Sequence, residues 1–173
     1  MGYAGGKKQN PTYRSMGDHT ETIEIDFDPS RITYGDLLDV FFKSHNPTKQ
    51  SWSVQYRSAV FYQDEDQKRE VTEAKDRLEK QLDRIVRTDI EGYTGFTMAE
   101  DYHQKYILKN SSAFLGELQL IYPDPANLVS STATARINGY LGGNGSRRQL
   151  QAELESLGLS ERAQKRLLGI VRK

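Results

Sequence analysis

The stretch "NPTYRSMGDHTETIEIDFDP", residues Asn10–Pro29, joins a polar, turn-rich loop to a run in which apolar and polar residues alternate. The alternation places Ile23, Ile25 and Phe27 on one face, which is the period-two pattern of a half-buried strand. Glu21 stands where the loop enters this strand. The pattern therefore predicts a carboxylate that is at least partly buried at a strand entry, and such a position needs a chemical or structural reason.

The following segments predict a mixed architecture of helices and strands. A helix is expected from Thr33 to about His45, because Asp36 stands at the capping-box distance and apolar residues recur at helical spacing behind it. A second strand is expected over Tyr56–Gln63, where aromatic residues are frequent, and the longest helix over Asp64–Arg84. The run "RIVRTDIEGY", 84–93, predicts a third strand.

The composition changes after about Pro125. The segment "NLVSSTATARINGYLGGNGS", 127–146, is rich in glycine and small residues and predicts a turn-filled connection. Ser146 then caps a helix that reaches about Leu157, and Ser160 caps a last helix to Val171. The sequence thus predicts two domains, an α+β domain over 1–125 and, over 126–173, a connection followed by a helical hairpin.

Composition and charge limit the classes of function. The 173 residues hold 24 Lys plus Arg and 24 Asp plus Glu, so no overall field favours nucleic acid or an anionic membrane. The sequence has no run of apolar residues long enough to cross a membrane and no secretory leader, so a cytoplasmic protein is expected. It also contains no cysteine, which excludes a thiol nucleophile and thiolate metal ligands among these residues.

Several other motifs have weaker functional interpretations. The glycine-rich runs "GYAGGKK" and "GYLGGNGS" are reminiscent of phosphate-binding loops but lack the specific lysine, so turns are favoured over a nucleotide site. His19 and Glu21 share a strand face, but spacing suggests no third ligand, and no metal is expected. The basic residues of the C-terminal hairpin, Arg172 and Lys173 among them, suggest a packing element with a basic surface rather than a reader of DNA.

A series of short motifs identifies a family. The runs "GYAGG" (2–6), "NPTY" (10–13), "HTE" (19–21), "SHNP" (44–47), "QYRS" (55–58) and "AEDYHQKYILKN" (99–110) occur in this order. Together they resemble the A-type peptide methionine sulfoxide reductases, which reduce the S epimer of methionine sulfoxide and so repair oxidised proteins under oxidative stress. The resemblance covers about residues 2–110, and the series is far more specific than any single motif.

The resemblance implies an α+β fold, a mixed sheet with helices packed on it as a two-layer plait. It also implies three site residues: Glu21 matches the family's carboxylic acid, and Tyr13 and Tyr56 match its two hydroxyl donors. A sulfoxide oxygen must gain protons as its bond to sulfur breaks, so a buried acid that donates a proton and two phenols that hold the oxygen suit this reaction. The family binds no cofactor and depends on thioredoxin or another thiol reductant, with oxidised protein or peptide methionine as its substrate.

The departures from the family pattern are as informative as the matches. The family's nucleophilic cysteine lies in a Gly-Cys-Phe-Trp motif ahead of the segment that matches "GYAGG", so we expect the first core strand and helix to be missing here. Ser51 stands where the family often has an aspartate. Three hypotheses remain: an inactive or truncated reductase domain, a module that binds methionine sulfoxide without turnover, and a structural domain. Without a thiol, no turnover is expected from this chain.

Overall fold

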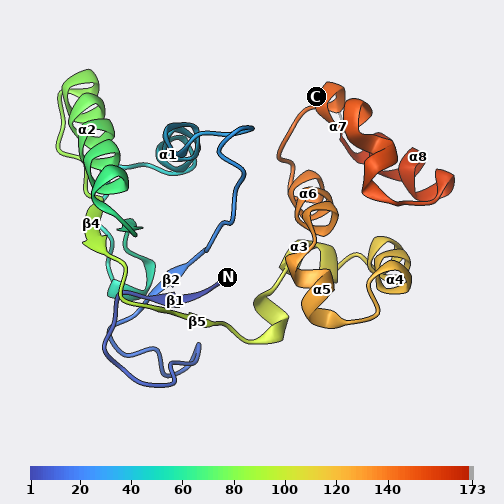
Figure 1. The fold of residues 1–173 in the computed structure, drawn as a ribbon, viewed down its shortest axis with the longest axis horizontal. Helices are drawn as coiled ribbons and strands as arrows, with labels where there is room; N and C mark the ends of the chain where they lie inside the picture. Colours follow the sequence, from blue (N-terminus) through green and yellow to red (C-terminus); the bar gives the residue numbers. More distant parts are fainter. Residues whose placement is uncertain (172–173) are drawn as a thin grey trace. The chain divides into compact units, whose positions relative to one another are not determined.

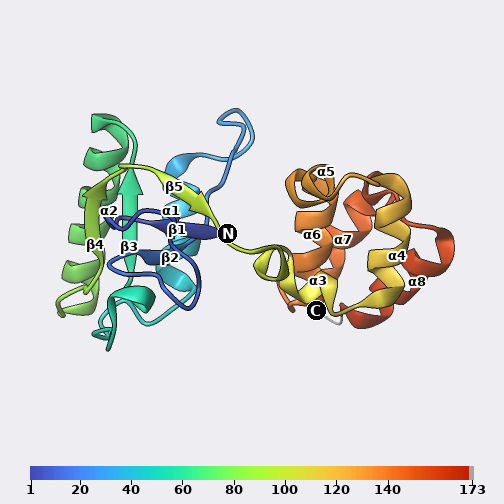
Figure 2. The same ribbon diagram turned by 90° about the horizontal axis from the view of Figure 1, so that it is seen from below.

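The computed structural model describes residues 1–171 and divides into two compact units, Met1–Glu100 and a second that begins at Asp101. The strands of the described residues all lie in the first unit, and the second unit is helical (Figures 1 and 2). The α+β class expected from the sequence is confirmed. Each unit is built around its own buried side chains.

Two small sheets form the first unit. In the antiparallel sheet, β1 (Gly2–Ala4) lies between β2 (Thr20–Thr22) and β5 (Phe96–Met98). In the parallel pair, β3 (Ala59–Tyr62) lies beside β4 (Asp89–Gly92). Among the described residues no strand pairs with the second edge of β2 or of β3. The two sheets therefore stay separate instead of forming the single mixed sheet that was expected.

Both long helices of this unit begin at the residues that the sequence indicates. Thr33 caps α1 (Tyr34–Lys43) through a capping box with Asp36, and Asp64 caps α2 (Glu65–Leu82) by accepting from the backbone N–H of Gln67. Their apolar residues share one core with Val60 and Ile90 of the parallel strands. Figure 2 shows α2 beside β3 and β4. The buried residues of this core are Leu38, Phe42, Val71 and Val86.

The strand expected over the alternating residues is mostly absent. Only Thr20–Thr22 pairs in the sheet, and the segment 23–27 continues without a partner strand. Ile23 and Ile25 are 67% and 49% exposed, so the expected half-burial of this run is wrong. The physical reason is that alternation buries a face only where a neighbouring strand or helix covers it, and nothing among the described residues covers this one.

The second unit is a bundle of short helices. After a 3₁₀ turn, η2 (Asp101–His103), come α3 (Tyr106–Lys109), α4 (Ser112–Ile121), α5 (Pro125–Ser130) and α6 (Thr132–Leu141). The chain ends with α7 (Arg147–Glu153), a further 3₁₀ turn η3 (Leu154–Leu157), and α8 (Glu161–Ile170). The predicted caps Ser146 and Ser160 are both present, and Gly158 ends η3 at φ +71°.

The expected turn-filled connection at 127–146 is wrong, since two helices occupy most of it. Asp124 caps α5 with Pro125 at its first position, and Ser131 caps α6 by accepting from the N–H of Thr134. The buried Thr134 hydroxyl donates back to the Ser131 carbonyl over 2.8 Å. Small and β-branched residues weaken helix propensity, but here the caps and the burial of Ile137 at 0% exposure outweigh it.

One core runs through the whole second unit. Its buried side chains come from every helix of four or more residues described after Glu100: Leu108, Phe114, Leu118, Leu128, Ile137, Tyr140, Leu150, Leu157, Leu159, Ala163, Leu167 and Val171. Compactness thus divides the chain after Glu100, whereas composition suggested a boundary near Pro125, because α3 and α4 pack with the later helices. Whether 1–125 and 126–173 act as separate domains stays a prediction. Arg172 and Lys173 lie outside the described residues.

Neighbouring positions of α4 give a matched test of this core. Leu118→Ala is expected to lower the free energy of unfolding by about 2–5 kcal/mol, because it leaves a cavity at a residue that is 0% exposed. Leu120→Ala, two residues on and 85% exposed, is expected to change it by less than about 0.5 kcal/mol. Urea unfolding followed by circular dichroism measures both, and equal effects would contradict the assigned core.

Candidate functional site

Two phenols that lie far apart in the sequence meet in the first unit. The hydroxyl oxygens of Tyr13 and Tyr56 are 3.3 Å apart, and the two side chains belong to residues that are 39% and 44% exposed. This distance is long for an O–H···O hydrogen bond, whose usual length is about 2.7–2.8 Å. The two phenols are therefore loosely bonded to each other, and both lie at the surface.

A glutamine connects the phenols to the carboxylate. The side-chain amide of Gln55 donates to Oε1 of Glu21 over 2.7 Å and to the hydroxyl oxygen of Tyr56 over 2.9 Å. Glu21 lies in β2 and is half-buried, which agrees with the partial burial that its position at the strand entry predicts. The structure thus brings Tyr13, Glu21 and Tyr56 into one hydrogen-bonded cluster.

The loop that carries Tyr13 is held at both ends. The Tyr13 backbone N–H donates to Glu100 over 3.0 Å, and the same carboxylate accepts from the Tyr3 hydroxyl over 2.6 Å. At the base of the loop, Asp18 accepts from the backbone N–H groups of Lys7 and Lys8, and these bonds lower the pKa of the Asp18 carboxyl. Tyr13 therefore projects from a closed loop.

Tyr56 is positioned by a short 3₁₀ turn, η1 (Val54–Tyr56), that is tied to β2. The Thr20 hydroxyl donates to the Val54 carbonyl over 3.1 Å, and Nε of Arg57 donates to the same hydroxyl over 2.8 Å. The Arg57 guanidinium also pairs with Glu91 of β4, which raises the pKa of this arginine. Arg57 thus links the turn that carries Tyr56 to both sheets.

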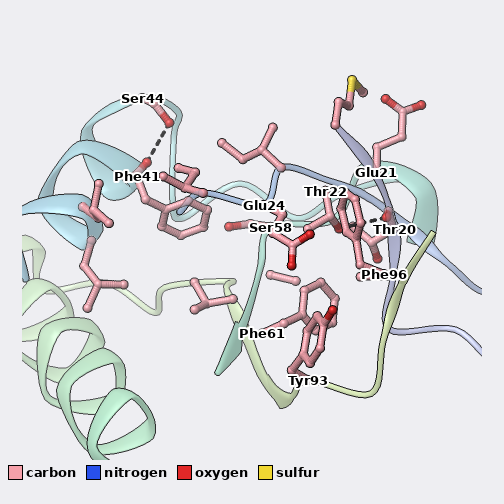
Figure 3. Close-up of a pocket in the computed structure, with 18 of the residues that line it drawn as sticks. Thr20, Glu21, Thr22, Glu24, Phe41, Ser44, Ser58, Phe61, Tyr93 and Phe96 are labelled. Carbon is pink, nitrogen blue, oxygen red and sulfur yellow. Dashed lines mark hydrogen bonds between the residues drawn. The ribbon is translucent and has the colours of Figure 1, made fainter. Parts of the chain in front are cut away.

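A groove of about 920 Å³ opens beside this cluster. Its lining includes Thr20, Glu21 and Thr22 of β2 and Phe61 of β3, which are labelled in Figure 3, together with residues of α1 such as Phe41. The described residues that line it all belong to the first unit. The groove is mainly apolar and exposes strand edges, which are surfaces that proteins usually cover.

The surroundings of Tyr56 favour its protonated form. The hydrogen bond with Tyr13, followed by partial burial and the negative charge of Glu21, raises the pKa of Tyr56 to about 12. A phenol with a raised pKa stays a neutral O–H donor throughout the physiological range. The folded state holds this proton more tightly than the unfolded chain does, so the associated stability is complete below about pH 10 and is lost as the pH rises through about 12.

Tyr13→Phe is expected to lower the pKa of Tyr56 from about 12 toward the ordinary value of about 10, because it removes the largest cause of the shift. The Tyr13→Phe variant and the double variant Tyr13→Phe with Tyr56→Phe differ only in the Tyr56 hydroxyl. Subtracting the absorbance of the double variant at 295 nm from that of the single variant therefore leaves the ionisation of Tyr56. Circular dichroism of the same samples limits the comparison to pH values at which the fold persists. An unchanged midpoint would show that the Tyr13 hydroxyl does not determine the shift.

His19 and His45 have structural partners. The backbone N–H of Gly6 donates to Nδ1 of His19 over 3.2 Å, and Nε2 of His19 contacts the Lys8 carbonyl at 2.8 Å. His45 contacts the Phe41 carbonyl at the end of α1, as its position in the sequence suggests. The described residues contain no group of three or more His, Cys, Asp or Glu that could hold a metal ion.

The glycines of "GYAGG" serve close packing. Gly5 has φ +77°, and a Cβ there would lie 2.4 Å from the ring of Phe61. A Cβ on Gly6 would lie 2.6 Å from the His19 ring. These contacts explain the motif as turn and packing chemistry, which the sequence favoured over a phosphate cradle.

Two positioning residues were not assigned from the sequence. Gln55 and Glu100 both lie within quoted motifs, "QYRS" and "AEDYHQKYILKN", but neither was assigned a role. The only available signal for Gln55 was its adjacency to Tyr56. The contact of Glu100 with a loop nearly ninety positions earlier in the chain has no local signature.

Two family models match this chain. The family described as peptide methionine sulfoxide reductase matches residues 1–121. The family described as selenoprotein methionine sulfoxide reductase A, helical domain, matches residues 125–169.

Individual proteins agree with these matches. A peptide methionine sulfoxide reductase of Drosophila melanogaster is 40% identical over 166 residues, which cover 92% of this chain and 65% of that protein. The peptide methionine sulfoxide reductase MsrA of Methanococcoides burtonii is 40% identical over 120 residues, which cover 63% of this chain and 78% of that protein. This chain therefore spans about two thirds to four fifths of these relatives.

The fold also matches a solved structure. Mxr1 from Saccharomyces cerevisiae in its reduced form superposes with a TM-score of 0.59 at 29% sequence identity. The superposition covers 63% of this chain and 68% of that one.

Proposed function

The chain belongs to the peptide methionine sulfoxide reductase family, and from this we propose that Tyr13, Glu21 and Tyr56 bind and protonate the oxygen of a methionine-S-sulfoxide side chain. The observation that carries this proposal is the convergence of two phenols and a carboxylate, from three separate segments, at one edge of the groove. The substrate is methionine sulfoxide within an oxidised peptide or protein.

The chemistry of a sulfoxide explains the arrangement. Its oxygen carries partial negative charge and accepts hydrogen bonds strongly, so it can take both phenols as donors in place of their 3.3 Å contact with each other. Glu21 lies one amide group away, through Gln55. In its protonated form this carboxyl donates to the oxygen as the sulfur–oxygen bond breaks.

The reducing group comes from outside these residues. In the net first step a thiol and a sulfoxide give a sulfenic acid and a sulfide, so the oxygen passes from the methionine sulfur to the thiol sulfur. A second thiol, ultimately from a reductant such as thioredoxin, then converts the sulfenic acid to a disulfide and water. The 173 residues contain no cysteine, so they hold and protonate the oxygen and do not accept it.

The groove is where we propose that a thiol-bearing segment lies. An extended segment there pairs with the free edges of β2 and β3 and covers the exposed Ile23 and Ile25. It also comes next to Glu21, which lines the same groove. This position would bring a thiol beside the sulfoxide that the phenols hold.

A second function is favoured by the absence of cysteine from the sequence. On its own, this chain is a module that binds methionine sulfoxide without reducing it. Its specificity for sulfoxide over sulfide then rests on the hydrogen bonds that the two phenols and Glu21 offer to the oxygen.

Calorimetric titration with three matched peptides tests the proposal. The peptides carry methionine S-sulfoxide, methionine R-sulfoxide or unoxidised methionine in one sequence. The S-sulfoxide is expected to bind most tightly and the unoxidised peptide most weakly, because only the sulfoxides present an acceptor to the phenols. Equal binding of all three, or no binding, would leave the cluster with a structural role only.

A further inference from the structure

An exposed tryptophan stands next to the phenol pair and has no part in the reaction described above. Trp52 is 83% exposed, yet its ring centroid lies 5.4 Å from that of Tyr56, with the ring planes at 51°. The hydroxyl of Tyr56 in turn lies 3.3 Å from that of Tyr13. The indole therefore extends the aromatic surface of the site outward.

The loop of Trp52 is fixed by hydrogen bonds and not by burial of its side chain. The Ser51 hydroxyl donates to the Ser53 carbonyl over 2.8 Å, and the Ser53 N–H donates back to that hydroxyl over 3.3 Å. The next residue, Val54, is anchored to β2 through the Thr20 hydroxyl. The fold thus holds a large apolar side chain in water at a defined place.

Trp52 contacts the ring of Tyr56, whose hydroxyl lies 3.3 Å from that of Tyr13, and Val54 follows two residues later in the same loop. Tyr13, Val54 and Tyr56 are 39%, 49% and 44% exposed. Clusters of this kind on a protein surface are typical of binding sites. Tryptophan and tyrosine contribute most at such sites, because they offer a large contact area at a small cost in conformational entropy together with a polar N–H or O–H.

The spacing along this surface fits an extended polypeptide. A methionine sulfoxide whose oxygen reaches the phenols of Tyr13 and Tyr56 leaves the indole beyond Tyr56 uncovered. The 5.4 Å between the two rings corresponds to about one or two residues of extended chain, which advances about 3.3 Å per residue. A side chain next to the oxidised methionine is therefore in reach of Trp52.

We propose that Trp52 is a specificity residue that packs against an apolar side chain flanking the methionine sulfoxide in an unfolded or extended polypeptide. The inference rests on the proposed function, since it places the oxidised methionine at the phenols. It defines the substrate class further: oxidised methionines with an aromatic or large aliphatic neighbour are preferred to the free amino acid.

Two S-sulfoxide peptides, one with phenylalanine and one with glycine on both sides of the oxidised methionine, test the inference by calorimetry. The unaltered chain is expected to bind the phenylalanine peptide about five- to tenfold more tightly, as one aromatic contact allows. Trp52→Ala is expected to abolish this difference without weakening the glycine peptide, and Trp52→Phe to restore part of it. Quenching of the fluorescence of the single tryptophan gives an independent readout.

Two controls separate the possible failures. Ile85→Ala removes another exposed apolar side chain, one that lines a separate shallow hollow, and is expected to leave both affinities unchanged. If the same preference for the phenylalanine peptide persists in Trp52→Ala, the role of Trp52 is wrong while the proposed function stands. If neither sulfoxide peptide binds the unaltered chain, the proposed function itself fails, and with it this inference.

Discussion

The 173-residue chain is expected to release no methionine from a methionine-S-sulfoxide peptide above the protein-free background, with dithiothreitol or with thioredoxin as reductant. Cluster residues that hold and protonate the oxygen do not supply the electron pair that sulfur must receive, and the sequence contains no thiol. A reductant from solution lacks the advantage of a group held in place, which is worth up to about 10⁵–10⁸ M in effective concentration. Chromatographic detection of the reduced peptide measures this directly.

The same assay has a positive counterpart. A chain extended ahead of Met1 by a segment that includes Gly-Cys-Phe-Trp is expected to reduce the peptide, because the groove beside Glu21 can take an extended segment. The matched control replaces the added cysteine by serine and is expected to be inactive. Thiol-dependent turnover by the unextended chain would contradict the account, as would an inactive extended chain that is folded and binds the S-sulfoxide.

Glu21→Gln in the extended chain is expected to lower the rate of the chemical step by about 10²–10⁴, which is the usual contribution of a positioned general acid. The glutamine keeps an oxygen that can accept from Gln55, so the cluster stays connected, but it cannot donate a carboxylic proton. Single-turnover kinetics with saturating S-sulfoxide peptide separate this effect from any change in binding.

Glu24→Gln is the matched control for Glu21. Glu24 lines the same groove three residues later, but it makes none of the hydrogen bonds that connect the two phenols to Gln55. It is expected to change the rate by no more than about twofold, as is usual for a surface substitution. If Glu24→Gln were as slow as Glu21→Gln, the effect would come from the charge of the groove and not from a specific acid.

Local sequence signals located the helices that follow clear N-terminal caps. The capping box of Thr33 and Asp36, and the serine caps at Ser146 and Ser160, appear in the structure at these residues. Such caps depend on a few adjacent residues, so the sequence alone contains the information. The helices within 127–146 were missed because their stability comes from tertiary burial of Leu128 and Ile137, which outweighs a weak local propensity.

The failed strand at 23–27 has the same kind of cause. Alternation of Ile23, Ile25 and Phe27 specifies which face a strand would bury, but pairing requires a neighbour along the edge. No neighbour exists there among residues 1–171, and the groove lies in its place. The alternating pattern thus marks an apolar face that a neighbouring strand could bury, whereas in the structure Ile23 and Ile25 of this face are exposed.

Most of the candidate site was predictable only through resemblance. Composition and spacing singled out Glu21 at a strand entry, and the motif series added Tyr13 and Tyr56. Neither indicates that Gln55 bridges the acid and a phenol or that Glu100 fixes the loop of Tyr13, because these contacts join segments from distant parts of the sequence.

No helix in the described part of the chain is both long and apolar enough to cross a membrane.

The most direct test of the central claim is a titration of the S-sulfoxide peptide against three proteins. They are the unaltered chain, the double variant that combines Tyr13→Phe with Tyr56→Phe, and the control Tyr93→Phe, which removes the hydroxyl of a tyrosine that lines the groove. Loss of two hydrogen bonds to the oxygen predicts binding at least roughly tenfold weaker for the double variant. Tyr93→Phe is expected to bind like the unaltered chain. Equal affinity of the double variant and the unaltered chain would contradict the claim that these phenols hold the sulfoxide oxygen.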